Sequence, residues 1–97
     1  MIIVRREWLA KDGLFREARA NAEMYRETFN PSSSWRIITP MSGQVNVIIV
    51  EEDYENLADS EEKWDERAAT EQFGPWIEEW QRVAVSNSYT INYYNLC

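Results

Sequence analysis

One long helical segment, residues 57–85, constrains this chain most, because it carries three of the five tryptophans and is interrupted once. Its apolar residues form a narrow stripe before the interruption and a broad one after it: Leu57, Trp64 and Ala68, then Phe73, Trp76, Ile77, Trp80 and Ala84. Proline lacks an amide N–H and disfavours helical geometry at the preceding residue. Gly74-Pro75 therefore predicts a kink, or two helices in tandem with Pro75 at the start of the second. Asp59 or Ser60 is the expected cap of the first helix.

The rest of the chain shows strand and helix periodicities in a definite order. Alternating apolar residues predict strands over residues 1–9, 35–41 and 89–96, and the run VNVIIV predicts a buried central strand over residues 45–52. Pro40 favours an edge position for the second strand. Apolar residues recur at helical spacing at Phe15, Ala18, Ala22, Tyr25 and Phe29. They predict an amphipathic helix, with Asp12 as its expected N-terminal cap.

The resulting order, β-α-β-β-α-β, predicts a ferredoxin-like α+β fold in which a four-stranded antiparallel sheet carries both helices on one face. We expect a single domain over residues 1–97, since two halves would be too small to bury a core. The chain also has five Trp, five Tyr and three Phe, which is much apolar area for its size. The sheet face without helices would then expose a large apolar patch. We therefore expect a homodimer in which two sheets close face to face into a barrel.

Charge and residue types exclude several classes of function. The net charge is −7, and twelve of the seventeen acidic residues lie in residues 51–97, so nucleic acid and anionic membranes are poor partners. No apolar run is long enough to span a membrane, and the N-terminus becomes charged at Arg5, too early for a signal peptide. A cytoplasmic location is expected. Histidine is absent and Cys97 is the one cysteine, so we expect neither a metal site nor a cofactor.

Several short motifs resemble those of one known group of proteins. Arg5 with Lys11-Asp12-Gly13 is similar to a strand-one arginine and a Lys-Pro-Gly turn, and Pro75-Trp76 is similar to a Pro-x-W stretch. Gly43, Tyr54-x-x-Leu57 and Trp64 are similar to a glycine, a (Y/F)-x-x-L step and a mid-helix tryptophan. On these motifs nearly the whole chain resembles the NIPSNAP-like branch of the dimeric α+β barrel superfamily. Where that family often has Glu-x-Arg-x-Tyr, this chain has Ile3-x-Arg5-x-Glu7, so only the arginine is kept.

The resemblance implies a homodimer with a pocket inside each sheet or between the two sheets. It implies no particular reaction. Related branches include cofactor-free monooxygenases of quinol-type substrates, haem-degrading enzymes and small-molecule isomerases. Many of these enzymes rely on a histidine, which this chain lacks.

The candidate ligand-binding residues are Arg5, Glu7, Trp35, Asn92 and Tyr93. Arg5 and Glu7 share one face of the first strand and suit an anionic or polar ligand if that face lines the barrel. The same pair also suits a structural ion pair near a dimer axis. The helical tryptophans Trp64, Trp76 and Trp80 are interpreted as core or interface anchors rather than as an aromatic box for a planar ligand.

Two functional hypotheses follow. The leading hypothesis is a soluble homodimer that holds a small ligand in its barrel without strong catalytic activity. The alternative is a cofactor-independent monooxygenase or isomerase acting on a small aromatic or polar substrate, with Glu7 or a tyrosine handling the proton. The ring-bearing side of residues 57–85 is expected to cover the sheet, so any pocket is expected on the opposite sheet face.

Overall fold

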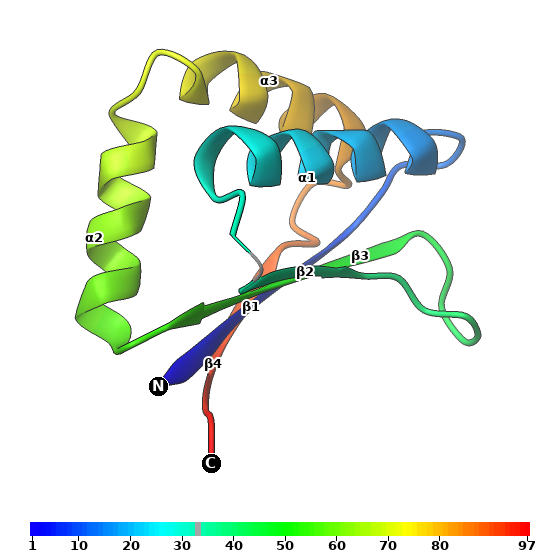
Figure 1. Ribbon diagram of the computed structural model, residues 1–97. Coiled ribbons are helices and arrows are strands. Elements are labelled where there is room, and N and C mark those ends of the chain that lie inside the picture. Colours follow the sequence, from blue (N-terminus) through cyan, green and yellow to red (C-terminus); the bar gives the residue numbers. More distant parts are fainter. Residues whose placement is uncertain (33) are drawn as a thin grey trace.

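The computed structural model describes residues 1–32 and 34–97 and has one antiparallel sheet with its helices on one side (Figure 1). The elements in chain order are β1 (Ile2–Leu9), α1 (Phe15–Phe29), β2 (Trp35–Ile38), β3 (Val47–Tyr54), α2 (Leu57–Ala68), α3 (Phe73–Val83) and β4 (Thr90–Asn95). The strands lie in the order β2-β3-β1-β4. The predicted ferredoxin-like α+β fold is confirmed, with the second helical segment divided into α2 and α3.

The division of that segment follows the sequence closely. Of the two expected outcomes, the structure has two helices in tandem, separated by residues 69–72. Gly74 and Pro75 lie in the first turn of α3, where the amide N–H that proline lacks would have no partner within the helix. The two helices can therefore point in different directions, and Figure 1 shows α2 standing beside the sheet while α3 lies next to α1.

The two expected helix caps are wrong. Asp59 N donates to Asn56 Oδ1 at 2.8 Å, so Asn56 caps α2, while Asp59 and Ser60 already lie within the helix. The N-cap position of α1 is Leu14, which provides no side-chain cap. Asp12 instead accepts a hydrogen bond from the loop before β3.

Two strands differ from their predicted bounds at the loop that joins them. β2 ends at Ile38, short of the predicted residue 41, and β3 begins at Val47 rather than at residue 45. Gly43 and Asn46 both adopt positive φ angles, 82° and 66°, and turn the chain there. The predicted places in the sheet are nevertheless confirmed, because β2 is an edge strand and β3 is central.

The two faces of the sheet differ in character. On β1, Val4, Arg6 and Trp8 are buried beneath the helices, whereas Arg5 and Glu7 lie half-buried on the opposite face. The pattern continues on β3, where the buried helix-side residues are Ile48, Val50, Glu52 and Tyr54. The main core thus lies between the sheet and the helices. Within the described residues, no helix is both long and apolar enough to span a membrane.

Candidate functional site

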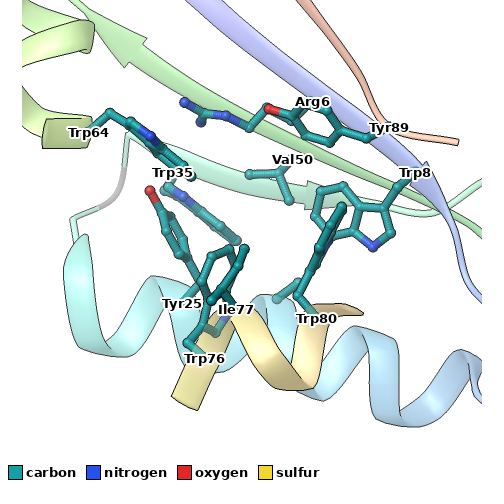
Figure 2. Close-up of a pocket in the computed structure, with 11 residues that line it drawn as sticks. Arg6, Trp8, Tyr25, Trp35, Val50, Trp64, Trp76, Ile77, Trp80 and Tyr89 are labelled. Carbon is teal, nitrogen blue, oxygen red and sulfur yellow. The ribbon is translucent and has the colours of Figure 1, made fainter. Parts of the chain in front are cut away.

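A cavity of about 230 Å³ lies between the sheet and the helices (Figure 2). It is lined by Arg6, Trp8, Ala22, Tyr25, Trp35, Val50, Trp64, Trp76, Ile77, Trp80 and Tyr89. These residues come from β1, β2, β3, all three helices and the segment before β4. All five tryptophans of the chain take part, and Arg6 is the one charged residue among the described residues of the lining.

The aromatic rings of the lining form two groups. In the first group, the Tyr25 ring centroid lies 4.8 Å from that of Trp76, 6.1 Å from that of Trp35 and 6.3 Å from that of Trp64. In the second group, the Trp80 ring centroid lies 6.0 Å from that of Trp8 and 5.8 Å from that of Tyr89. Figure 2 shows the tryptophans of the two groups apart from one another, with Val50 between them. A flat molecule placed between the groups would contact aromatic rings on both sides.

Buried hydrogen-bond donors accompany these rings. Among the described residues, Arg6 Nε, Trp8 Nε1 and Trp35 Nε1 are buried and have no acceptor. A buried polar group without a partner costs free energy, so native proteins contain few of them. All three atoms belong to lining residues, and all three are donors. Among the described residues that line the cavity, the buried polar side-chain atoms without a partner are thus all donors.

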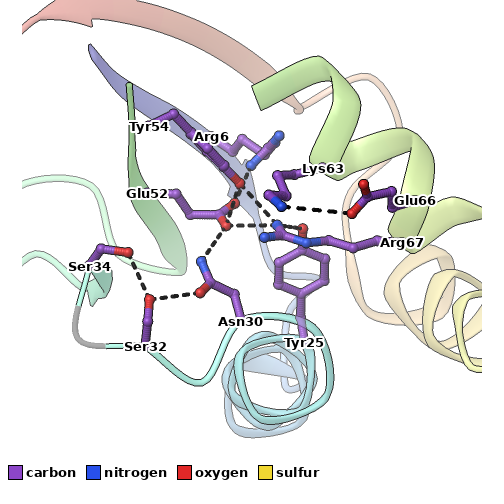
Figure 3. Close-up of polar contacts among 10 residues, drawn as sticks. All are labelled: Arg6, Tyr25, Asn30, Ser32, Ser34, Glu52, Tyr54, Lys63, Glu66 and Arg67. Atoms are coloured by element: carbon purple, nitrogen blue, oxygen red, sulfur yellow. Dashed lines mark hydrogen bonds and ion pairs between the residues drawn. The ribbon is translucent and has the colours of Figure 1, made fainter. Parts of the chain in front are cut away.

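A cluster of charged and polar side chains adjoins the cavity (Figure 3). At its centre is the Glu52 carboxylate, which is completely buried. Glu52 Oε1 accepts from Arg6 Nη1 at 2.6 Å, and Oε2 accepts from Arg67 Nη1 at 2.8 Å, Tyr54 OH at 2.8 Å and Asn30 Nδ2 at 2.9 Å. Arg67 Nη1 also donates to Tyr25 OH at 2.8 Å. The cluster thus links α1, α2 and β1 to the central strand β3.

The environment of the cluster keeps its hydroxyl groups neutral. Burial raises the pKa of Tyr25 and Tyr54, and the Glu52 carboxylate raises both further. Burial also raises the pKa of Tyr89. For Arg6, burial lowers the pKa, but Glu52 and the neighbouring tyrosines together outweigh this effect, so the pKa is raised overall. At neutral pH the tyrosines are therefore uncharged and both arginines are cations.

The five predicted ligand residues do not come together in one place. Arg5 and Glu7 lie on the face opposite the cavity, with Arg5 Nε 2.8 Å from Glu7 Oε1. Asn92 pairs with Arg5 in the sheet and shares that face. Trp35 is the member that lines the cavity. Tyr93 pairs with Val4 on the helix side, but it is 48% exposed and lies outside the lining.

A pocket on the open face of the sheet, enclosed by a second copy, stays a prediction, but this single chain already has a cavity elsewhere. The cavity lies beneath the helices, and not on the sheet face that they leave open. The interpretation of Trp64, Trp76 and Trp80 as core residues is correct, since all three pack in or against the core. The same three rings also line the cavity, so they are both core residues and candidate ligand contacts.

Sequence reasoning missed Arg6 and Glu52 as members of a site. A signal was present, because alternation along residues 1–9 places Arg6 on the same face as Val4 and Trp8. A charged residue on an otherwise apolar strand face indicates a buried charge that needs a partner. Glu52 likewise continues the buried alternation of Ile48 and Val50. Within the described residues, no group of three His, Cys, Asp or Glu side chains is placed to hold a metal ion.

No protein-family model matches the sequence, and no curated protein matches it. Solved structures do match. One is an uncharacterized NIPSNAP domain protein from Burkholderia xenovorans, with 13% identity, a TM-score of 0.75 and coverage of 100% of this chain and 95% of that one. A NIPSNAP family protein from Agrobacterium tumefaciens has 13% identity, a TM-score of 0.80 and coverage of 99% and 92%.

A third solved structure with this fold is a cofactor-independent oxygenase from Streptomyces nogalater. It has 7% identity and a TM-score of 0.72, and the match covers 99% of this chain and 92% of the oxygenase. At such identities the likeness shows the fold alone. The resemblance that the sequence motifs predicted is thereby confirmed: this chain has the fold of the NIPSNAP domain proteins, which the cofactor-independent oxygenase shares.

Proposed function

We propose that this protein binds a small, flat aromatic molecule in the cavity between the sheet and the helices. The observation that carries the proposal is the lining itself, in which all five tryptophans of the chain surround one space of about 230 Å³. An apolar cavity of about 150 Å³ in another protein stays dry and binds benzene. The space in this protein therefore suits a molecule of roughly one or two fused rings.

Ala22 provides the means of testing this proposal, because it lines the cavity and belongs to α1. Ala22→Leu extends a side chain into the space that the ligand would occupy. Ala20→Leu is the matched control, since Ala20 is exposed on the same helix. Indole and 2-naphthamide, titrated by calorimetry, are expected to bind one molecule per chain to the wild type and to Ala20→Leu, and not to Ala22→Leu. Equal binding by Ala22→Leu, or failure of the wild type to bind any aromatic probe, neutral or anionic, would refute the proposal.

The same proposal includes a homodimer formed through the open face of the sheet. The charged side chains on this face are already paired within the chain. Arg36 Nε lies 3.2 Å from Glu51 Oε1, and Arg36 Nη2 lies 3.1 Å from Asp53 Oδ1. Arg5 likewise contacts Glu7. Apolar side chains between them, including the exposed Ile38, would be covered by a second copy. Sedimentation at micromolar concentration is expected to give a dimer, and Ile38→Glu a monomer. A wild type that sediments as a monomer contradicts this part of the proposal.

A second candidate function is the oxygenation of a small aromatic substrate without a cofactor. It is favoured by the shared fold of the Streptomyces nogalater oxygenase. The residue expected to handle the proton, Glu7, lies on the other sheet face, so Tyr25 and Tyr89 would have to take that role in the cavity. Oxygen uptake with 1,4-naphthohydroquinone is the test. Uptake no faster than in buffer, or unchanged in Tyr89→Phe, would leave ligand binding as the function.

A further inference from the structure

The charges buried beside the cavity do not balance. Arg6 and Arg67 are only 8% and 9% exposed, and both donate to the same carboxylate, that of the fully buried Glu52. The tyrosine hydroxyls in the cluster are neutral, as described above. Two guanidinium cations and one carboxylate leave a surplus of one positive charge in this buried place.

A surplus buried charge is costly unless an opposite charge comes near it. One arginine would be enough to pair Glu52, so the second needs a further explanation. Of the two arginines, Arg6 is the one that lines the cavity. Its Nη1 is used by Glu52, while its Nε has no acceptor among the described residues. Trp64 lies against the same guanidinium, 4.9 Å from ring centroid to Cζ, and orients it without neutralising it.

The groups around Arg6 contribute little further negative charge. In the part of the chain that the structure describes, the titratable and charged groups near it, on β3, α1, α2 and the segment before β4, are Glu52, Tyr54, Tyr25, Arg67 and Tyr89. Glu52 is the one anion of this set, and it is shared with Arg67. A buried excess of positive charge is also unusual in a chain whose net charge is −7. An anion at Arg6 would therefore balance the cluster.

We propose that the ligand of the cavity is a planar aromatic anion, a carboxylate or a phenolate, whose charged oxygen lies against Arg6 while its ring lies between the two aromatic groups. This inference rests on the proposed function and adds the charge of the ligand to it. The unpartnered indole N–H groups of Trp8 and Trp35 agree with an acceptor-rich ligand. Arg6 is then the residue that determines specificity.

The test compares two probes of nearly the same shape, 2-naphthoate and the neutral 2-naphthamide, by calorimetric titration at neutral pH. The wild type is expected to bind 2-naphthoate about tenfold more tightly or better, as a charge-assisted hydrogen bond to a guanidinium provides. Arg6→Gln is expected to lose this discrimination, so that the two affinities become similar. Arg6→Lys, which keeps the charge, is expected to retain part of it. The exposed Arg19 gives the matched control, because Arg19→Gln removes the same charge at the surface.

A second arm distinguishes the two anion classes. 4-Nitrophenol, whose hydroxyl ionises near neutral pH, is titrated below and above its own pKa. If phenolates are ligands, its affinity rises with pH in the wild type and not in Arg6→Gln. If only 2-naphthoate shows the preference, the ligand is a carboxylate.

The possible failures are separable. Binding of 2-naphthamide with no preference for either anion would overturn this inference and leave the proposed function intact. The same holds if Arg6→Gln discriminates as well as the wild type. Failure of the wild type to bind any of these aromatic probes would overturn both proposals.

Discussion

Arg6 Nη1 donates to Glu52 Oε1 at 2.6 Å, joining two residues that are 46 positions apart on neighbouring strands. The bond lies on the helix side of the sheet, beside the aromatic cavity. It gives the apolar core a charged edge, and the carboxylate is the common acceptor of both buried arginines. The same arrangement thus bears on both the stability of the fold and the chemistry of the cavity.

Glu52→Gln is expected to destabilise the protein strongly. The substitution keeps the shape of the side chain but leaves Arg6 and Arg67 as two buried cations without a carboxylate. Removing one partner of a buried ion pair costs about 3–5 kcal/mol. Urea unfolding measures the loss, and Glu79→Gln is the control, because Glu79 pairs with Arg82 at the surface. A similar fall in the midpoint for both variants would contradict the buried role of Glu52.

Ala22 and Ala18 lie one turn apart on α1, and both are buried, but only Ala22 lines the cavity. Ala18→Leu must displace packed atoms and is expected to cost about 1–3 kcal/mol. Ala22→Leu fills existing space and is expected to stay within about 1 kcal/mol of the wild type, or to exceed it. Thermal unfolding of the two variants in parallel is the measurement. Equal losses would mean that the space beside Ala22 is not available to a side chain.

The fold could be predicted because its signals are local. Each signal acts within a few residues: the apolar spacing in α1, the alternation in β1 and the helix break at Pro75. The prediction of the α2 cap was wrong because Asn56 lies just outside the apolar pattern that located the helix. The side chain that caps a helix belongs to the residue at which the chain turns into the helix. Apolar periodicity does not identify that residue.

The site could be predicted only in part, because it depends on packing between distant segments. Alternation correctly placed Arg5 and Glu7 on one sheet face, but it could not tell which face the helices would cover. The closeness of Trp8 to Trp80 likewise depends on the path of α3 across the sheet. The available signal was Arg6, a charge on an apolar strand face, and its partners are distant in sequence.

Asn21 and Trp76 hold α1 and α3 together through two reciprocal hydrogen bonds. Asn21 Nδ2 donates to the Trp76 carbonyl oxygen at 3.2 Å, and Trp76 Nε1 donates to the Asn21 carbonyl oxygen at 3.1 Å. Asn21→Ala loses the first bond and is expected to cost about 1–2 kcal/mol. Asn21→Asp is expected to cost more at neutral pH, because a buried carboxylate would face a carbonyl oxygen.

Urea unfolding at neutral and at acidic pH checks the order of these two variants. Protonation of the new carboxyl restores a donor toward the Trp76 carbonyl oxygen, so the Asn21→Asp deficit relative to wild type should shrink as the pH falls. An Asn21→Asp variant as stable as the wild type at neutral pH would show that the side chain does not contact this carbonyl group.

Stability is expected to fall at alkaline pH because tyrosines are buried in the folded protein, Tyr25 and Tyr54 most deeply. The pKa values of Tyr25 and Tyr54 are raised in the folded protein, first by burial and then by Glu52. In an unfolded chain tyrosine ionises with a pKa of about 10. Below that pH both states keep these protons, and the contribution to stability is complete. Above it the unfolded chain releases protons that the folded protein retains, so the free energy of unfolding decreases as pH rises.

Each of these tyrosines is expected to lower the free energy of unfolding by up to about 1.4 kcal/mol per pH unit above pH ~10. Tyr54→Phe removes one of these titrating groups, so its stability should depend on pH less steeply than that of the wild type. Urea midpoints measured at intervals from neutral to strongly alkaline pH give both slopes. Two results would contradict this prediction: the same slope in Tyr54→Phe as in the wild type, or a wild-type stability that stays constant at alkaline pH. Either would show that these hydroxyls ionise as freely in the folded protein as in the unfolded chain.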